Sequence, residues 1–328
     1  MKLAVSIIVL DDFTRLMAAL RSLYDTTTTP FKVYIVVDNA LGRDDPQIER
    51  VLADYPQVEL IFNEKRRGFA ANHNQVMRRA TADYVALLND DIILHEGALD
   101  TLVDYLDAHP GVGLVGPQQL NPDGSHQVAV YSDPTLLRLV YKISGLATLT
   151  SETSRIRRFM QRTGLVYLFR VDSLHIQTRT RPVDIVKGVA MVARRTAYEQ
   201  VGLMAESTLA YGEEADWHLR MRQAGWEVAL VVEAAVTHFG HGHGSLRLSA
   251  KLLPEDRKGM LNYFIKHRPR WQVWVMRGAI IISHGFWSLF WLPFSRERSR
   301  VHRGVMAVGW DWQPEETTFT SENDPQRV

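Results

Sequence analysis

Two aspartates directly follow a hydrophobic run in the segment Leu87–Asp91, which reads LLNDD. Carboxylates beside a buried strand are costly to remove from water unless a cation or a helix terminus neutralises them. Oxygen ligands on a tight turn suit Mg²⁺ or Mn²⁺, which keep coordination positions open for phosphate oxygens. The segment therefore indicates a divalent-metal site, and the alternative is a turn that caps the helix expected near Gly97.

Three acids gather where another helix is expected to start, in the segment Tyr211–Asp216, which reads YGEEAD. The dipole of a helix favours acids at this end, so the cluster has a purely structural explanation. The functional interpretation is that one carboxylate is a general base, whose pKa is held close to neutral by burial and by its acidic neighbours.

Three histidines lie close together in the glycine-rich segment 238–244, at His238, His241 and His243. Closely spaced histidines in a short Gly-rich loop rarely form a tetrahedral zinc site unaided, because metal ligands need supporting hydrogen bonds. We therefore expect one of them to join the aspartate turn on the same metal ion. A flexible turn is the alternative.

Hydrophobic periodicity predicts the elements that must position these residues. Short apolar runs typical of buried strands alternate with stretches of helical period, which indicates βαβ units. Such units form a mostly parallel sheet covered by helices on both faces. The expected strands are 4–10, 33–37, 58–62, 84–88 and 112–115, and the expected helices are 13–24, 46–55, 68–79 and 98–109.

Ligands in such sheets bind beyond the carboxyl ends of the strands. That rule directs attention to Asp11, Asp38 and Asn89–Asp91, each at a strand end. Asp38 could hydrogen-bond a nucleobase or ribose, or could simply be a turn residue. Lys187-Gly188 interrupts a later apolar run and could lie against a diphosphate or an acceptor, with a strand-end bulge as the alternative.

Missing residues and motifs remove support from several classes of protein. The chain has no cysteine, which excludes a disulfide scaffold, a thiolate zinc site and a cysteine nucleophile. It has no GxGxxG after the first strand, no GxxxxGK[ST], no HExxH and no GxSxG. The segment Met1–Leu10 is typical of a strand and shows neither a basic n-region nor a cleavage site, so we expect no signal peptide.

The formal net charge of +1 conceals a segregation of charge along the 328 residues. Residues 247–303 carry 12 Lys and Arg against 3 Asp and Glu, whereas residues 304–328 carry 1 against 5. Four of the eight tryptophans lie in the basic segment. Basic charge mixed with tryptophan favours an anionic membrane surface as partner over nucleic acid.

The segment 271–294 is apolar enough to be examined as a membrane helix, but Arg277, His284 and Pro293 make it a poor spanning one. We expect an interfacial helix or helix pair, with a spanning helix or burial against the rest of the protein as alternatives. The acidic end is expected to be disordered. The predicted organisation is a catalytic α/β domain at 1–245, a basic, Trp-rich helical segment that associates with membranes at 246–303 and an acidic tail at 304–328.

In their order along the chain, these segments resemble the family-2 inverting glycosyltransferases with a GT-A fold, and among them the rhamnosyltransferase-like branch. The resemblance covers about residues 3–245. It is carried by Val5–Val9, Val36–Ala40, Gly68–Ala70 with Asn74, Leu87–Asp91 with Gly97–Leu99, Gly113–Pro117, Asp123-Gly124, Lys187–Met191 with Arg194-Arg195, Val201-Gly202, and Tyr211–Asp216 with Arg220, Gly225 and His238.

The resemblance implies roles for the matched positions in binding the donor. Asp38 would contact the nucleotide base, and the strand end at Leu10–Asp11 would line the same pocket. The other residues that we expect at the donor site are Gly68, Asn74, Asn89, Asp90, Lys187 and Gly188.

The resemblance also implies the catalytic groups. Asn89 and Asp91 would occupy the two acid positions of the family's metal motif, with Asp91 as the direct ligand and His238 completing the metal shell. Glu214 stands where the family places its catalytic base. This sequence departs from the family pattern in having Asn89 in place of the first metal-motif acid and Glu214 in place of an aspartate.

The implied activity is metal-dependent and inverting. A divalent cation, Mg²⁺ or Mn²⁺, would neutralise the departing nucleoside diphosphate while a carboxylate deprotonates the acceptor hydroxyl. By analogy, the sugar would be L-rhamnose from dTDP-rhamnose, and the acceptor a lipid-linked or polysaccharide glycan of the cell envelope. The enzyme would be peripheral at the cytoplasmic face of the membrane. The alternatives are a transferase that uses a UDP-hexose and a catalytically silent GT-A domain that binds nucleotide-sugars or acts as a scaffold.

Overall fold

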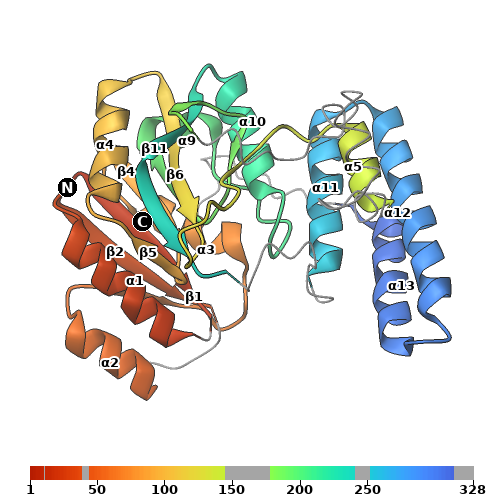
Figure 1. Ribbon diagram of the computed structural model, residues 1–328, viewed down its shortest axis with the longest axis horizontal. Coiled ribbons are helices and arrows are strands. Elements are labelled where there is room, and N and C mark those ends of the chain that lie inside the picture. Colours follow the sequence, from red (N-terminus) through yellow and green to blue (C-terminus); the bar gives the residue numbers. More distant parts are fainter. Residues whose placement is uncertain (11, 39–43, 145–177, 241–251, 314–328) are drawn as a thin grey trace, which may run out of the picture.

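A nine-stranded mixed sheet forms the centre of the N-terminal part of the molecule (Figure 1). The structure is a computed structural model that describes residues 1–10, 12–38, 44–144, 178–240 and 252–313. The strand order is β3-β2-β1-β4-β10-β6-β11-β5, and β8 pairs with β11. The strands of this sheet are β1 (Leu3–Val9), β2 (Phe31–Val37), β3 (Glu59–Phe62), β4 (Tyr84–Asn89), β5 (Ile92–Leu94), β6 (Val112–Leu120), β8 (Arg181–Pro182), β10 (Ala190–Arg194) and β11 (Glu227–His238), and a separate pair is formed by β7 (Val130–Tyr131) and β9 (Ile185–Val186).

Helices cover both faces of this sheet, as the alternating periodicity predicts. On β1, Leu3, Val5, Ile7 and Val9 point into one hydrophobic core, and Ala4 points into the other. The first core is completed by α1 (Phe13–Thr26), α2 (Pro46–Asp54) and α4 (Ala98–Ala108), and the second by α3 (Phe69–Arg79), α9 (Arg195–Val201) and α10 (Glu213–Gln223). The predicted α/β fold class is confirmed.

Three strands of the sheet, β5, β8 and β10, pair antiparallel with their neighbours. Two of them, β10 and β5, position the segments that the sequence indicates as sites. The β10 strand lies between β4 and β6, so the segment before it reaches the carboxyl end of β4. The short β5 strand pairs antiparallel with the end of β11. Neither pairing follows from the sequence, because periodicity does not indicate which strand pairs with which, and β5 is only three residues long.

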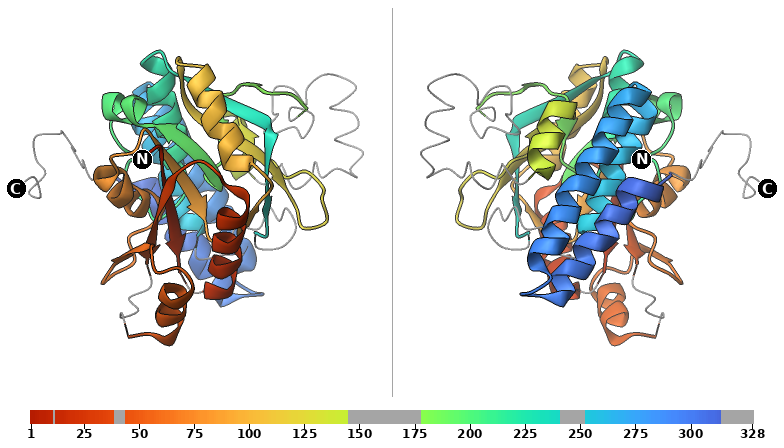
Figure 2. Two further views of the ribbon diagram at one scale, coloured as in Figure 1. Left: turned by 90° about the vertical axis from the view of Figure 1, so that its left-hand side faces the viewer. Right: turned by 90° about the vertical axis from the view of Figure 1, so that its right-hand side faces the viewer.

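A helical unit lies at one end of the sheet, beside α10 (Figures 1 and 2). It has a hydrophobic core of its own, which includes Leu261, Phe264, Met276, Ile280 and Val305. One described helix, α12, is long and apolar enough to cross a membrane by length and composition alone. The helices are α5 (Leu136–Ile143), α11 (Leu253–His267), α12 (Arg270–Trp291) and α13 (Arg296–Asp311).

The structure corrects the expectation of a disordered acidic segment from residue 304. Residues 304–311 form the second half of α13, because Val305 and Val308 are buried in the core of the helical unit with Met276 and Ile280. The rest of that segment, 314–328, lies outside the described residues. Asp11, His241 and His243 also lie outside them.

Candidate active site

The carboxyl ends of β2, β1 and β4 lie side by side and place three predicted segments at one edge of the sheet. In the parallel registers, Val9 is beside Val37, and Ile8 is beside Asn89. Asp38 follows β2 directly, and its backbone N–H donates to the Val9 carbonyl over 3.0 Å. The ends of these strands are therefore a common site, as expected for a sheet of this kind.

Asp91 and His238 meet because β5 and β11 are paired. The register sets His238 opposite Ile92, and the Phe239 backbone N–H donates to the Asp91 carbonyl over 2.9 Å. His238 Nε2 lies 3.3 Å from Asp91 Oδ1. The sequence predicts these two residues as metal ligands, and the structure brings them together.

Gln127 fixes the orientation of the His238 ring. Gln127 Nε2 donates to the His238 carbonyl over 2.7 Å, so its Oε1 atom faces His238 Nδ1 at 2.9 Å and accepts a hydrogen bond from it. His238 Nε2 is left facing Asp91 Oδ1, a buried atom without a hydrogen-bond partner in the described structure. Two acceptors that face each other need a proton or a cation between them, so the residues fit a metal ion.

The charges of the aspartate turn also favour a cation. Burial, followed by the charge of Asp91, raises the pKa of Asp90 to about 7. Burial also acts to raise the pKa of Asp91, but the contact with His238 and the charge of Arg15 hold that pKa below its usual value. The Leu10 backbone hydrogen-bonds to Asp90, which places the end of β1 at this turn. In the described ranges, no three His, Asp or Glu side chains lie close enough to hold a metal ion alone.

Asp38 is almost fully buried and holds the loop that precedes α3. Its Oδ1 atom accepts from Asn63 Nδ2 and from the Arg67 backbone N–H, both over 2.9 Å, and its Oδ2 atom accepts from the Gly68 N–H over 3.3 Å. These hydrogen bonds give Asp38 a structural role in the loop before α3. The contact with a nucleotide base that the resemblance implies stays a prediction.

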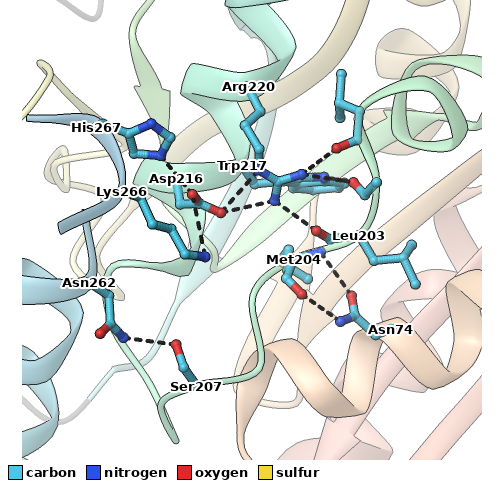
Figure 3. Close-up of polar contacts among 12 residues, drawn as sticks. Asn74, Leu203, Met204, Ser207, Asp216, Trp217, Arg220, Asn262, Lys266 and His267 are labelled. Carbon is cyan, nitrogen blue, oxygen red and sulfur yellow. Dashed lines mark hydrogen bonds and ion pairs between the residues drawn. The ribbon is translucent and has the colours of Figure 1, made fainter. Parts of the chain in front are cut away.

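Asn74 supports the segment that leads to α10 (Figure 3). It is fully buried, its Nδ2 atom donates to the Met204 carbonyl over 2.8 Å, and its Oδ1 atom accepts from the Met204 N–H over 3.2 Å. Further along this segment, the Leu209 carbonyl accepts from the Phe69 N–H over 2.9 Å. These contacts tie α3 to the approach of α10, and a role of Asn74 in donor binding stays a prediction.

Glu214 lies at the start of α10, after a backbone that few residues adopt. Tyr211 has φ of 75° and Gly212 has φ of 93°, both in the left-handed region. Glu214 Oε1 accepts a hydrogen bond from the Gly188 N–H over 3.3 Å. Burial raises the pKa of Glu214, although this hydrogen bond and the Lys187 charge act against the shift.

Gly188 is a glycine because Glu214 approaches it closely. A Cβ atom at this position would lie 2.7 Å from Glu214 Oε1 and 2.9 Å from Phe69 Cζ. The next residue, Val189, accepts a hydrogen bond at its carbonyl from the Asn89 N–H over 3.0 Å. The peptide at 188–189 thus connects Glu214 with the turn that carries Asp91.

The helix that carries Glu214 is held by a polar cluster that the sequence alone does not indicate (Figure 3). Asp216 Oδ1 lies 2.7 Å from His267 Nε2 of α11, and Asp216 Oδ2 accepts from Arg220 Nε over 3.1 Å. Arg220 also donates to the carbonyls of Gly202 and Leu203, over 3.2 and 2.7 Å. The cluster fixes α10 to α11 on one side and to the segment before it on the other.

Direct backbone packing joins α11 to the start of α10. A Cβ atom at Gly259 would lie 2.0 Å from the Tyr211 carbonyl oxygen, so only glycine allows this approach. Nearby, Glu255 Oε2 accepts from the Leu209 N–H over 3.0 Å. Contacts therefore cross the predicted boundary between 245 and 246, and that domain division stays a prediction.

Comparisons with known proteins identify the family of the chain. The model of the family described as "Glycosyl transferase family 2" matches residues 5–169. An N-acetylglucosaminyl-diphospho-decaprenol L-rhamnosyltransferase of Mycobacterium tuberculosis is 26% identical over 281 residues, which cover 81% of this chain and 86% of the relative.

Solved structures share the fold at low sequence identity. GalNAc-T7 with UDP, GalNAc and Mn²⁺ has a TM-score of 0.57 at 12% identity, and the match covers 94% of this chain and 55% of that one. The mannosyltransferase PcManGT from Pyrobaculum calidifontis, in complex with GDP-Man and Mn²⁺, has a TM-score of 0.53 at 13% identity and covers 95% of this chain and 88% of that one. The family model spans half of the chain, and the fold and the rhamnosyltransferase relative agree with it, so the chain belongs to glycosyl transferase family 2 and is a glycosyltransferase with a GT-A fold.

Proposed function

We propose that the chain transfers L-rhamnose from dTDP-rhamnose to a lipid-linked or polysaccharide acceptor of the cell envelope. The mycobacterial relative supports this substrate class, because its name describes L-rhamnose transfer to N-acetylglucosaminyl-diphospho-decaprenol and the similarity runs over most of both chains. The mechanism rests on the 188–189 peptide, which joins Glu214 to the aspartate turn after β4. A single backbone segment holds both groups, and transfer in one displacement needs such a fixed arrangement.

Glu214 is the general base of this proposal. Its raised pKa makes the carboxylate a better proton acceptor than an exposed glutamate. It takes the proton of the acceptor hydroxyl while the hydroxyl oxygen bonds to C1 of the donor sugar, on the face opposite the diphosphate. The bond between C1 and the phosphate oxygen breaks in the same step, and its electron pair leaves with the diphosphate. The configuration at C1 is inverted.

Asp91 and His238 are the proposed ligands of Mg²⁺ or Mn²⁺, and two structures of the same fold contain Mn²⁺. When bound, the cation supplies the positive charge that neutralises the departing diphosphate. The unpartnered Asp91 Oδ1 atom opposite His238 Nε2 supports this assignment. Two protein ligands leave positions open for phosphate oxygens, which Mg²⁺ and Mn²⁺ prefer.

The donor nucleotide is proposed to lie at the carboxyl ends of β1 and β2, lined by Leu10, Asp11 and Asp38. Lys187, whose charge acts on Glu214, is the proposed cationic partner of the diphosphate. The acceptor then approaches from the α10 side. A lipid-linked acceptor would be met at a membrane, and we propose the cytoplasmic face as the working place of the enzyme.

The test of the base is a pair of variants at neighbouring carboxylates. Glu214→Gln keeps the shape of the side chain but cannot accept the proton, so transfer should fall by about 10²–10⁴-fold. Glu213→Gln is the matched control and should keep most of the activity. Transfer is measured with dTDP-rhamnose, Mn²⁺ and a GlcNAc-diphospho-lipid acceptor, and folding is checked by circular dichroism. Full activity in Glu214→Gln, or its loss only in Glu213→Gln, would contradict the assignment.

A thermal-shift series tests the donor and separates the alternatives. The protein is heated with dTDP-rhamnose, with UDP-hexoses and with each nucleotide-sugar plus Mn²⁺. Stabilisation by dTDP-rhamnose that increases with Mn²⁺ supports the proposal. Stabilisation by a UDP-hexose alone would indicate the other transferase, and nucleotide-sugar binding without any transfer would indicate a catalytically silent domain.

A further inference from the structure

The outward face of α12 is a continuous apolar stripe. Ile282, Leu289 and Trp274 expose 74%, 72% and 68% of their surface. Their spacing of eight and seven residues puts them on one side of the helix. Arg277 is the only Lys, Arg, Asp or Glu between residues 271 and 291. We call this face the α12 outer stripe; it consists of Trp271, Trp274, Val275, Ile282, Phe286, Leu289 and Phe290.

The opposite face of α12 is buried and carries the polar residues. Arg277 donates to the Gly309 carbonyl over 2.9 Å, at the end of α13. His284 Nδ1 lies 2.9 Å from His302 Nδ1 of α13, and Ser288 Oγ donates to the Ser299 carbonyl over 3.2 Å. These contacts fix the rotation of α12, because turning the stripe inward would leave buried polar groups without partners.

Basic residues lie at both ends of the α12 outer stripe. On α13, which packs along α12 (Figure 2), the exposed charged side chains of the first two turns are mostly arginines. The guanidinium of Arg298 lies 4.4 Å from the ring centre of Trp291. At the other end of α12, Lys266 and Arg270 are exposed next to Trp271. The exposed arginines of α13 are Arg296, Arg298, Arg300 and Arg303.

An apolar face bordered by basic side chains and tryptophans matches the interface of an anionic bilayer. A second copy of this chain would bring the same basic residues against each other, so charge favours the lipid surface over a dimer. At about 1.5 Å per residue the 22 residues of α12 are long enough to span a bilayer. However, α13 packs along α12, so a spanning α12 would bring the arginines of α13 into the hydrocarbon core. We therefore do not expect α12 to span the bilayer.

We propose that α12 lies in the plane of an anionic leaflet, with its outer stripe in the interfacial region and the basic residues against lipid headgroups. The docking surface would bring the enzyme to its lipid-linked acceptor, and in this respect the inference rests on the proposed function. Since α11 connects α12 to α10 through Gly259 and His267, docking also sets how the helix with Glu214 stands over the bilayer.

The test is co-sedimentation of the full chain with vesicles, without donor or acceptor. Phosphatidylcholine vesicles are compared with vesicles that also contain phosphatidylglycerol. The stripe variant Ile282→Gln, Phe286→Gln, Leu289→Gln changes only exposed side chains and should weaken binding by about tenfold or more. The matched control is Leu52→Gln with Leu137→Gln, two exposed apolar residues outside the stripe, and it should bind as the unchanged protein does.

Two further experiments test the role of the basic residues and the in-plane orientation of α12. Arg300→Gln with Arg303→Gln should reduce the preference for phosphatidylglycerol, and salt should have the same effect. Extraction with alkaline carbonate should release the protein, since a spanning helix would stay in the membrane. Equal vesicle binding by the stripe variant, resistance to carbonate, or a dimer that the stripe variant abolishes without any vesicle binding would each overturn the inference.

Failure of the docking proposal can be distinguished from failure of the proposed function. With a short, water-soluble acceptor, the stripe variant should transfer sugar at the rate of the unchanged protein, whereas Glu214→Gln should not transfer. If both the stripe variant and the unchanged protein bind vesicles equally, the docking surface is wrong whatever the transfer assay gives. If docking depends on the stripe but no sugar is transferred, the proposed function is wrong and the surface stands.

Discussion

Glu213 and Glu214 are adjacent in sequence, but their carboxylates have different surroundings. Glu214 accepts a hydrogen bond from the Gly188 N–H, and the next residue, Val189, accepts one from Asn89, just before the proposed metal ligand Asp91. Glu213 is 5% exposed, and its Oε2 atom has no hydrogen-bond partner among the described residues. Burial and the charge of Glu214 raise the pKa of Glu213 well above its usual value. These differences favour Glu214 for catalysis and make Glu213 a destabilising group.

Replacing Glu213 by glutamine should therefore stabilise the protein at neutral pH. A carboxyl with a higher pKa in the folded than in the unfolded state favours folding while it is protonated, and this contribution is lost as pH rises through the folded-state pKa. Glu213→Gln should raise the free energy of unfolding at neutral pH by on the order of 1 kcal/mol. In urea titrations, the difference in the free energy of unfolding between the variant and the unchanged protein should disappear as the pH falls below about 4. Equal stability of the two proteins at neutral pH would show that the carboxyl group of Glu213 does not destabilise the folded protein.

A substitution at Gly188 tests whether Glu214, the proposed base, must lie close to the backbone. In Gly188→Ala the new Cβ atom would meet Glu214 Oε1 at 2.7 Å and Phe69 Cζ at 2.9 Å, so at least one of them must move. Transfer should fall by about tenfold or more, because small displacements of a catalytic group are costly. The control is Gly111→Ala, where a Cβ atom meets nothing within 4 Å. Unchanged activity in Gly188→Ala would contradict the arrangement.

The elements that carry the site were predicted to different degrees. The strands β1, β2 and β4 follow from apolar runs, and their ends identify Asp38 and Asp91 without any structure. The support of the site could not be predicted, because Gln127 and His238, or Asp216 and His267, are far apart in sequence and meet only in the fold. Gly259 gives no signal either, since its role depends on the carbonyl of Tyr211.

The contact between α10 and α11 should have a measurable signature in stability. Burial acts to raise the pKa of Asp216, but His267, Arg220 and Lys266 lower it to about 2. A lowered carboxylate pKa contributes stability above the unfolded-state value near 3.8, and this contribution is lost as pH falls through about 2.

Asp216→Asn should accordingly lower the free energy of unfolding by about 2 kcal/mol at neutral pH. The difference from the unchanged protein should shrink as the pH falls from about 4 toward 2. Chemical denaturation at a series of pH values measures both effects. A loss of stability that is the same at every pH would show that the ion pairs are not its cause.

On the scale of the whole molecule, the uneven distribution of charge corresponds to a spatial division. The acidic N-terminal part contains the carboxylates proposed as metal ligand and base, Asp91 and Glu214, and the basic segment forms α11, α12 and the first half of α13. The sequence predicts this division, but it predicts the end of the helical part wrongly, because α13 continues to Asp311. Hydrophobic residues such as Val305 extend the helix past the point where the charge changes sign.

We propose that this molecule performs metal-dependent, inverting transfer of rhamnose to a lipid-linked acceptor. The most direct test is to incubate the full chain with dTDP-rhamnose, Mn²⁺ and a GlcNAc-diphospho-lipid, and to examine the product by mass spectrometry and NMR. We expect addition of a single rhamnose with the configuration at C1 inverted relative to the donor, and loss of the reaction on chelation of the metal. A product with retained configuration, transfer that is indifferent to chelation, or transfer of a hexose from a UDP donor instead would contradict it.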